Sequence, residues 1–393
     1  MPKIVHVINT YFAATYFVGE QFRYFGSRGY EMHLICPASP YIDEYRSKMG
    51  FSFFPVTITR RYSPLCDLVA LMKICNYLRK TGPDVIVGHT PKGGMLAMLA
   101  GRITGVKTRI YFRHGLPFET AKGLSRRILI ATERINAGLS TKVVIVSRSV
   151  YRESMRYRLN PENRQIVLGM GTCGGIDASG RYNPDLVDKP GVRALKASLG
   201  ISETDYVVGF TGRLVRDKGI ADLIAAFDLL TVALPNRTIK LLLVGMFEER
   251  DSLPAEIRSR ILSDNSIIYT GFVNEGIEKY YAMMNQLVLP TYREGLPISV
   301  IEASSMRIPV ITTRVTGSVD SIVENHTGIF VDNNPVSIAE GIKHYIENPD
   351  ISKRHGENGR AHVLSNFDHP IIWKEIEKLY AVPSFIKTTQ KPD

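Results

Sequence analysis

Residues 206–234, YVVGFTGRLVRDKGIADLIAAFDLLTVAL, decide the fold of the chain. The stretch opens on an apolar run, 206–211, which is typical of a parallel strand with both faces covered. After a Gly-Arg turn, apolar side chains recur at helical spacing, at Ile220, Leu223, Ile224 and Phe227. A strand that leads directly into a helix predicts a βα unit and a parallel sheet.

The same alternation extends over most of the chain and predicts two α/β domains. Further apolar runs lie at 3–9, 33–36, 84–88, 109–113 and 142–147, and then at 239–245, 266–270, 286–290, 309–312 and 329–332. The pattern is interrupted at 177–205, which is rich in Gly, Pro and Asp and predicts a linker. We therefore expect two Rossmann-like, doubly wound domains that face each other across a ligand-binding cleft.

The composition is that of a globular protein in a reducing compartment. The 393 residues, 44% of them hydrophobic and 22% charged, suffice for two domains of average size. The four cysteines show no spacing typical of a zinc site or a disulfide framework. The first residues, MPKIVHVINTYF, lack the features of a secretory signal, and no apolar run is long enough to cross a bilayer. We expect a cytoplasmic protein, either soluble or peripheral at a membrane.

Positive charge is concentrated in the front half. Residues 1–182 carry 26 Lys and Arg against 11 Asp and Glu, whereas residues 183–393 carry 23 against 27, so the net charge of +11 comes from the front. This asymmetry favours an anionic partner, such as nucleic acid, a phosphorylated substrate or an anionic membrane face; the alternative is a solvated surface without a partner. Since no recognition-helix or RNA-binding signature accompanies the charge, we expect no nucleic acid.

An anion-binding turn follows the strand at 206–211. The sequence GRLVRDKG, 212–219, places Arg213 and Lys218 on either side of the turn, and we expect a helix to begin near Lys218. Amides at the amino end of a helix attract an anion, Arg can bind two phosphate oxygens at once, and Lys adds a compact charge. The turn therefore predicts a diphosphate site, the alternative being an exposed turn with solvated cations.

A pair of glutamates follows the strand at 286–290. In PTYREGLPISVIEASS, 290–305, Pro297 suits the first helical position, so we expect Glu294 in the loop and Glu302 in an early turn of the helix. Carboxylates there can accept hydrogen bonds from sugar or ribose hydroxyls, and the amides of Ile298 and Ser299 can approach a phosphate. In the alternative interpretation Glu294 complements the helix dipole and Glu302 is an exposed helical residue.

With both motifs in place, the chain resembles, over essentially its whole length, the retaining glycosyltransferases of family 4, which have the GT-B architecture. GRLVRDKG resembles the diphosphate motif of the family, and EGLPISVIE, 294–302, resembles its E-x7-E motif. Four further segments resemble the members that build bacterial capsule, O-antigen and related glycans on lipid carriers: HTPKGG at 89–94, RHGLPF at 113–118, LGMGTCGGID at 168–177 and VTGSVDSIVENHTGIFV at 315–331.

The resemblance implies a role for each motif residue. Arg213 and Lys218, next to Gly212, would hold the diphosphate of a nucleotide sugar, Glu294 would contact the donor sugar, and Glu302 would contact the ribose. The remaining donor contacts would come from Gly271, Phe272 and Val273 at the nucleobase and from Gly295, Leu296, Ile298 and Ser299. His114 would reach the donor sugar or the transferred group; alternatively it is a strand-end histidine that bonds to backbone.

The domain limits and the reaction are expectations of the same kind. The resemblance implies an acceptor-binding domain at 1–182, a donor-binding domain at 183–366, a helix at 367–381 that returns toward the first domain, and a flexible tail at 382–393. A hexose or N-acetylated hexosamine would pass, with retention, from a UDP-sugar to a hydroxyl of a polyprenyl-diphosphate-linked sugar. The sequence identifies no carboxylate nucleophile, so the resemblance favours same-face attack.

The alternatives are an epimerase of the same architecture and a nucleotide-sugar-binding protein without activity. A Rossmann dehydrogenase is disfavoured because no G-x-G-x-x-G follows the first strand. We expect no metal or other cofactor, since two cations and a helix terminus can neutralise the diphosphate and the nearest acidic cluster, 203–205, precedes a strand. The oligomeric state stays open.

The front half offers a candidate surface for acceptor and membrane. Residues 122–138, KGLSRRILIATERINAG, predict a helix with apolar side chains for burial or lipid contact. We expect Arg126 and Arg127, together with Lys92, Gly93 and Gly94, to face the lipid-linked acceptor or the inner face of the cytoplasmic membrane; the alternative is a helix packed on the sheet with solvated charges. The first loop, NTYFAATYFVGEQF at 9–22, departs from the family because it contains a single glycine and several aromatic residues.

Overall fold

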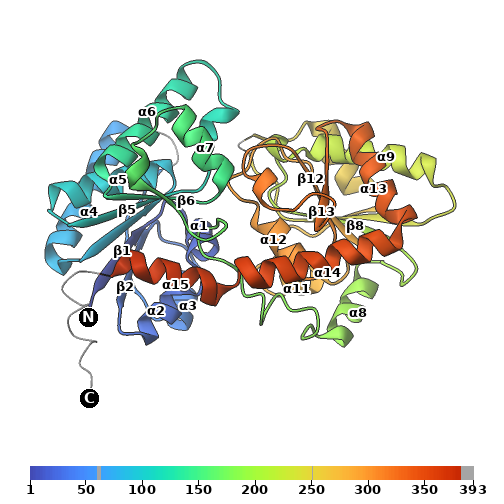
Figure 1. The fold of residues 1–393 in the computed structure, drawn as a ribbon, viewed down its shortest axis with the longest axis horizontal. Coiled ribbons are helices and arrows are strands. Elements are labelled where there is room, and N and C mark those ends of the chain that lie inside the picture. The colour runs from blue at the N-terminus through green and yellow to red at the C-terminus, as the bar shows by residue number, and fades with distance from the viewer. Residues whose placement is uncertain (60–62, 250, 382–393) are drawn as a thin grey trace. The chain divides into compact units, whose positions relative to one another are not determined.

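The computed structural model describes residues 1–59, 63–249 and 251–381, which form two compact units. Among the described residues, the first unit comprises residues up to Gly175 together with 370–381, and the second comprises residues from Ile176 to His369. Each unit is an α/β domain with a parallel sheet (Figure 1), which confirms the expected fold class. In the described residues no helix combines the length and the apolar character that a membrane span requires.

The sheet of the first unit has the strand order β3-β2-β1-β4-β5-β6-β7, and all its pairs are parallel. Its strands are β1 (Lys3–Val7), β2 (Glu31–Cys36), β3 (Ser52–Pro55), β4 (Val85–His89), β5 (Thr108–Arg113), β6 (Lys142–Ile145) and β7 (Gln165–Val167). The two edge strands, β3 and β7, are not predicted from the sequence. Both are short and partly exposed, so they lack the long apolar run that identifies a buried strand.

Helices cover both faces of this sheet. They are α1 (Tyr11–Phe17), α2 (Gln21–Ser27), α3 (Ile42–Met49), α4 (Pro64–Thr81), α5 (Pro91–Ile103), α6 (Gly123–Leu139), α7 (Arg148–Arg156) and α15 (His369–Tyr380), with short 3-10 turns η1 (Pro117–Glu119) and η2 (Glu162–Arg164). On one face α4, α5 and α6 share a core with Val5, Ile86 and Tyr111. On the other face His6 of β1 contacts Phe22 of α2 and Tyr380 of α15.

The helix α15 is attached to the first unit although it lies at the far end of the chain. The ring of Trp373 packs against that of Tyr24, with centroids 4.6 Å apart and planes tilted by 44°, and Glu377 accepts a hydrogen bond of 2.9 Å from Arg28. The predicted flexible tail, 382–393, lies outside the described residues.

The sheet of the second unit has the order β10-β9-β8-β11-β12-β13, again parallel throughout. Its strands are β8 (Tyr206–Thr211), β9 (Ile239–Val244), β10 (Ile267–Tyr269), β11 (Gln286–Leu289), β12 (Val310–Thr313) and β13 (Gly328–Val331). Its helices are α8 (Lys189–Ser198), α9 (Ile220–Ala233), α10 (Ala255–Ser263), α11 (Ile277–Tyr281), α12 (Ile298–Ser305), α13 (Pro335–Glu347) and α14 (Pro349–Asn366), with η3 (Arg216–Lys218) and η4 (Ser318–Asp320). Strand order reverses between β8 and β11, where such sheets bind ligands.

The segment expected to be a linker, 177–205, belongs to the second unit and contains α8. Its Gly, Pro and Asp start that helix: Asp188 is the N-cap, its side chain accepts from the amide of Gly191, and a proline occupies the first turn. The unit boundary falls after Gly175 and not after residue 182, because Ala178 donates its amide to Asp368 at 3.0 Å.

Candidate functional site

The predicted donor residues gather at the carboxyl edge of the second sheet. Backbone hydrogen bonds join the segments that leave the neighbouring strands β8, β9 and β10. Gly212 donates to Val244 at 2.9 Å, and Gly245 donates to Gly271 at 3.0 Å. These bonds hold Gly212 and Arg213 close to residues 271–273. In that segment the side chain of Phe272 is half exposed.

The turn after β8 docks directly on the loop after β11. Gly219 adopts a left-handed conformation (φ 69°) in which a Cβ atom would collide with the carbonyl oxygen of Pro290, so this position requires glycine. The carbonyl of Asp217 accepts hydrogen bonds from the Thr291 hydroxyl at 3.1 Å and from the Tyr292 amide at 2.8 Å. Two motifs that lie more than seventy residues apart in sequence therefore form one structure.

An ion pair between Lys218 and Glu294 lies at the centre of this contact. The Nζ atom of Lys218 donates to Oε1 of Glu294, and both side chains are mostly buried. A second pair, Arg293 with Asp217 at 2.7 Å, lies beside it. Because all four side chains are mostly buried, these interactions are stronger than those of exposed pairs, and the two catalytic candidates are held in a defined geometry.

The second cation of the diphosphate motif also has a carboxylate partner. Arg213 donates through Nη1 to Glu248 at 2.9 Å while about half of its side chain stays exposed. Glu248 is not among the site residues predicted from the sequence. A signal was available, because Glu248 follows β9 and the carboxyl ends of parallel strands share one edge.

The start of α9 differs from the expectation. A 3-10 turn, η3, occupies 216–218, and the α-helix begins at Ile220. Asp251, which the sequence analysis also missed, accepts the amide of Asp217 on its carboxylate at 2.9 Å, and its carbonyl accepts the amide of Arg216 at 3.0 Å. These two amides are therefore bound by protein acceptors.

Glu302 is a buried residue, so the alternative of an exposed helical position is wrong. It is 8% exposed, and its two oxygens accept hydrogen bonds from the hydroxyls of Tyr182 at 2.7 Å and Tyr281 at 2.6 Å. Burial raises the pKa of the Glu302 carboxyl, while both tyrosine bonds act in the opposite direction. Tyr182, the last residue of the first domain predicted from the sequence, belongs to the second unit.

The helix α12 begins one residue later than expected, since Pro297 is its N-cap and Ile298 its first residue. The amide of Val300 donates to the carbonyl of Pro297 at 3.1 Å, and the amides of Ile298 and Ser299 precede this first bonded turn. The loop before α12 is fixed from the other side by Gly317, where a Cβ atom would approach the carbonyl oxygen of Gly295 to 2.5 Å. Leu296 is buried.

In the first unit His114 follows β5 and belongs to a row of histidines. Its Nε2 atom lies 2.9 Å from Nδ1 of His89, whose Nε2 atom lies 3.0 Å from Nδ1 of His6. The ring of Phe17 stacks on His114 with centroids 3.6 Å apart. The alternative of a histidine bonded to backbone does not describe this arrangement. Burial lowers the pKa of His114 and of His6 to about 3, so both rings are neutral near neutral pH.

Lys92, Gly93 and Gly94 do not form the expected surface. Lys92 is 4% exposed, and its ammonium group pairs with Asp67 at 2.6 Å. Gly94 lies against the ring of Tyr111, where a Cβ atom would collide, and Gly93 is buried as well. The glycines let α5 approach the sheet closely, whereas Lys92 joins α5 to Asp67 of α4.

Arg126 and Arg127 point to different surroundings. Arg126 donates to the hydroxyl of Tyr157 at 2.9 Å and lies over its ring, whereas Arg127 is exposed. On the same helix, α6, Leu124, Ile128 and Ile135 are 72%, 41% and 46% exposed. The outward face of α6 thus combines apolar side chains with positive charge.

Two family models match the chain. One, described as glycosyl transferases group 1, matches residues 192–362, and the other, described as glycosyl transferase 4-like domain, matches residues 13–171. The chain belongs to this family of glycosyltransferases. The glycosyltransferase is 29% identical over 389 residues to the capsular polysaccharide biosynthesis glycosyltransferase CapM of Staphylococcus aureus, a match that covers 99% of this chain and 98% of the relative.

A more distant relative and a solved structure are similar to this chain over most of their length. The UDP-Gal:alpha-D-GlcNAc-diphosphoundecaprenol alpha-1,3-galactosyltransferase of Escherichia coli is 22% identical over 363 residues, covering 92% of this chain and 90% of the relative. The crystal structure of HepE from Anabaena in complex with UDP and glucose has a TM-score of 0.80 at 17% identity and covers 96% of this chain and 99% of that one. At this identity the likeness shows the fold, and it confirms the expected GT-B architecture of the glycosyltransferase.

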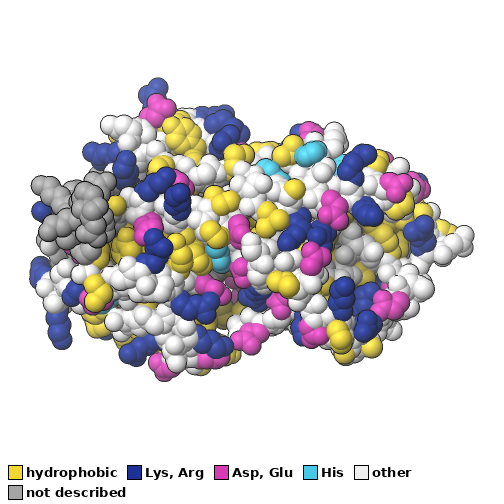
Figure 2. Space-filling model, turned by 60° about the horizontal axis from the view of Figure 1, so that its bottom comes forward, with side chains coloured by type: hydrophobic (Ala, Val, Ile, Leu, Met, Phe, Trp, Pro, Cys, Tyr) yellow, Lys and Arg dark blue, Asp and Glu magenta, His cyan; other side chains and the backbone are white. Residues whose placement is uncertain are grey.

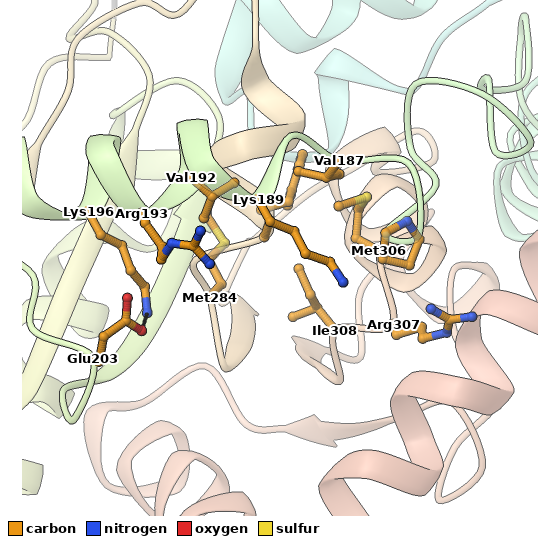
Figure 3. A pocket seen from close by; sticks show the side chains of 13 residues that line it. Val187, Lys189, Val192, Arg193, Lys196, Glu203, Met284, Met306, Arg307 and Ile308 are labelled. Carbon is orange, nitrogen blue, oxygen red and sulfur yellow. Dashed lines mark hydrogen bonds and ion pairs between the residues drawn. The ribbon is translucent and has the colours of Figure 1, made fainter.

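A separate hollow of about 500 Å³ lies in the second unit of the glycosyltransferase (Figure 3). Lys189 and Arg193 extend from α8 over Met284, Met306 and Ile308, and Lys196 pairs with Glu203. Among the described residues that line it there is no member of the two donor motifs.

The described residues contain no cluster of three His, Cys, Asp or Glu side chains that could hold a metal ion. On the face of the glycosyltransferase drawn in Figure 2, Lys and Arg side chains lie scattered among Asp and Glu and do not gather into one continuous patch. A stripe of single sign, as nucleic-acid-binding proteins often present, is not visible on that face.

Proposed function

We propose that this glycosyltransferase moves a hexose or N-acetylated hexosamine from a UDP-sugar to a hydroxyl of a polyprenyl-diphosphate-linked sugar during synthesis of a bacterial surface glycan. The observation that carries the donor assignment is the joining of Lys218, Glu294 and Arg213 at one edge of the second sheet. The neighbour HepE, whose structures hold UDP and UDP-glucose, supports the choice of UDP. CapM and the diphosphoundecaprenol-dependent galactosyltransferase support the glycan and the lipid-linked acceptor.

In the proposed reaction two cations bind the donor diphosphate. Arg213 and Lys218 stabilise the negative charge that develops on the leaving phosphate, an effect that is large in a site where water is excluded. Their present partners, Glu248 and Glu294, occupy the positions of anionic ligands, and a bound diphosphate would share or replace these contacts. Glu294 would then be available to accept hydrogen bonds from the sugar hydroxyls.

We propose transfer with retention at the anomeric carbon, by attack of the acceptor hydroxyl on the same face that the diphosphate leaves. The leaving phosphate accepts the proton of the acceptor, so the enzyme needs no carboxylate nucleophile and acts by positioning and electrostatic stabilisation. His114 is the contribution of the first unit, as a neutral hydrogen-bonding group toward the transferred sugar. We also propose that the reaction needs no metal, because the motif already supplies two cations to the diphosphate.

We further propose that the protein works at the inner face of the cytoplasmic membrane, attached through the outward face of α6. The exposed Leu124, Ile128 and Ile135 could enter the interfacial region while Arg127 binds anionic headgroups. Such a contact would bring the enzyme to a lipid-linked acceptor.

The donor assignment is tested by thermal unfolding in EDTA with UDP-, GDP- and ADP-sugars. A ligand at about 100 times its Kd adds about 2.7 kcal/mol of stability to the folded state. We expect a rise in Tm with a UDP-sugar that is lost in the Arg213→Ala/Lys218→Ala variant. A matched double variant, Lys189→Ala/Arg193→Ala, removes two cations of the same unit at the separate hollow and should keep the rise.

Three results would contradict parts of this proposal. No rise with any nucleotide sugar, in EDTA or with Mg²⁺, would contradict the donor site. A rise that needs Mg²⁺ would contradict metal independence. Inversion at the anomeric carbon in the product, observed by NMR, would contradict retention.

A further inference from the structure

Three histidines form a diagonal row across the first sheet. His6 lies in β1, His89 ends β4, and His114 follows β5, and these three strands are neighbours. In the strand register His6 is opposite Val87, so His89 lies two residues further along. His89 is opposite Phe112, so His114 again lies two residues further along. Because side chains alternate along a strand, steps of two keep all three rings on one face of the sheet.

The row is hydrogen-bonded from end to end, and it continues into the C-terminal helix. His114 and His89 are 2.9 Å apart, His89 and His6 are 3.0 Å apart, and Nε2 of His6 lies 3.2 Å from the hydroxyl of Tyr380 in α15. His6, His89 and Tyr380 are at most 2% exposed. Water therefore has little access to the three inner members of the row.

The number of N–H and O–H donors in the row determines which group donates in each of its hydrogen bonds. A neutral imidazole has one N–H donor and one bare acceptor nitrogen. A ring that accepts a hydrogen bond from one neighbour must therefore donate to the other. Among the described residues, Tyr380 has no hydrogen-bond partner other than His6. If Tyr380 accepted from His6, its own buried O–H would be unsatisfied, which is costly. Tyr380 therefore donates to Nε2 of His6.

The remaining protons follow from that first bond. With Nε2 of His6 an acceptor, its proton is on Nδ1 and is donated to Nε2 of His89. His89 then carries its proton on Nδ1 and donates it to Nε2 of His114. His114 is left with its proton on Nδ1, the ring nitrogen that bonds to none of the other described residues.

We propose that Tyr380, His6 and His89 are positioning residues that hold His114 in the Nδ1–H tautomer, so that it presents a hydrogen-bond donor to the reacting groups. The inference rests on the proposed function in one respect, the use of His114 in the reaction. The tautomer itself is a property of the first unit and can be measured without substrate.

The ring plane of His114 is fixed by a residue of segment 9–22, which is expected to be a loop but contains the helix α1 and the start of α2. Phe17, the last residue of α1, lies against the imidazole at 3.6 Å between centroids and 10° between planes. The stack leaves the ring edge, with its nitrogens, to make hydrogen bonds. The histidine row therefore orients the proton of His114, and Phe17 of α1 orients its ring.

Nitrogen NMR of ¹⁵N-histidine-labelled protein tests the proposal, since long-range ¹H–¹⁵N spectra distinguish a protonated ring nitrogen from a bare one. The chain has 9 histidines, and the signals of His114 are assigned by their loss in His114→Asn. We expect a protonated Nδ1 and a bare Nε2 at His114. In Tyr380→Phe the first donor is removed, and we expect a second population with the proton on Nε2.

The matched control is Tyr30→Phe, because the Tyr30 ring lies 6.3 Å from that of Tyr380 and is not part of the row. It should leave the tautomer of His114 unchanged. Fluorescence of Trp373, which lies in the same helix as Tyr380, verifies that each variant is folded. If Tyr380→Phe does not fold, His6→Asn interrupts the row one position later and serves the same purpose.

A bare Nδ1 at His114 in the unchanged protein, or a tautomer that is the same in Tyr380→Phe, would overturn the proposal. In the transfer assay, kcat of Tyr380→Phe should fall in proportion to the fraction of His114 that lacks the Nδ1 proton. The KM for the donor should stay unchanged. If His114→Asn keeps full activity while the spectra show the expected tautomers, His114 has no role in the proposed reaction. The row would still determine the tautomer of His114.

Discussion

Lys218 is the single residue whose charge the proposed reaction uses most directly. It is mostly buried, it pairs with Glu294, and its turn is fixed by a glycine that no other residue can replace. The neighbouring Arg213 is more exposed and pairs with Glu248. At this scale the site consists of cations that are already oriented by carboxylates, which reduces the reorganisation that charge development would otherwise require.

We predict that Lys218→Ala lowers kcat by about a hundredfold to a thousandfold, or about 2.7–4 kcal/mol, the usual effect of removing one group that meets developing charge. Lys343→Ala, an exposed lysine of α13, is the control and should leave kcat unchanged. Steady-state kinetics with a UDP-sugar and a lipid-linked acceptor provide the measurement. Turnover near that of the unchanged enzyme would remove Lys218 from the proposed mechanism.

At the scale of elements, a buried ion pair holds β5 to α6 directly before His114. Arg113 donates to Glu133 at 2.7 Å, both side chains are at most 1% exposed, and Tyr111 donates to the other oxygen of Glu133 at 2.9 Å. Arg113 also donates to Ser154 of α7. Three elements therefore meet at one charged network, and the strand end that carries His114 is fixed by it.

We predict that Glu133→Ala destabilises the fold by about 3–5 kcal/mol, because it leaves the Arg113 guanidinium buried without its counter-charge. Urea unfolding followed by Trp373 fluorescence measures the change in the first unit. Glu375→Ala breaks an exposed pair with Lys378 and should cost no more than about 1 kcal/mol. Equal effects of the two substitutions would show that the buried network does not stabilise the unit.

The outward face of α6 gives a second prediction at this scale. Sedimentation with anionic vesicles should decrease in Arg127→Glu and in Leu124→Ser/Ile128→Ser, since one removes headgroup attraction and the other removes apolar insertion. Arg193→Glu in α8 makes the same charge change in the second unit and should have no comparable effect. If the unchanged protein does not sediment with the vesicles at all, the membrane proposal is rejected.

At the scale of the whole molecule, the buried histidines make stability depend on pH. Burial lowers the pKa of His6 to about 3 and that of His89 well below 6.5, whereas both take up protons near 6.5 in the unfolded chain. Between these values the unfolded state binds more protons than the folded state, so stability falls as the pH drops. The slope is about 1.4 kcal/mol per pH unit for each histidine below about pH 6.5.

Urea unfolding of the unchanged protein and of His6→Asn at several pH values tests this prediction. Trp373 is the one tryptophan of the chain and lies in α15, so its fluorescence reports on the unit that contains the histidines. We expect the slope to be smaller in His6→Asn by the contribution of one group. Stability that does not change between about pH 7.5 and about pH 5 would contradict neutral, buried rings.

Much of the architecture follows from local patterns in the sequence. Continuous apolar runs marked the buried strands within one or two residues, and β8 was located without error, because burial on both faces leaves no polar positions. The short edge strands β3 and β7 are not predicted from the sequence. Within the expected linker, Gly, Pro and Asp residues form the start of α8. In these places the local signal is weak or shared by a turn and a helix cap.

The sequence by itself determined the two α/β units, the two motifs at 212–219 and 294–302, and the family. Only the tertiary structure decided that Glu302 is buried between two tyrosines and that Glu248 and Asp251 bind the turn at 212–219. It decided as well that Lys92 forms an internal ion pair with Asp67. It also decided that Tyr380 joins a row ending at His114. The reason is physical: strand and helix patterns arise from neighbours in sequence, whereas the partner of a buried polar group is chosen by packing between distant segments.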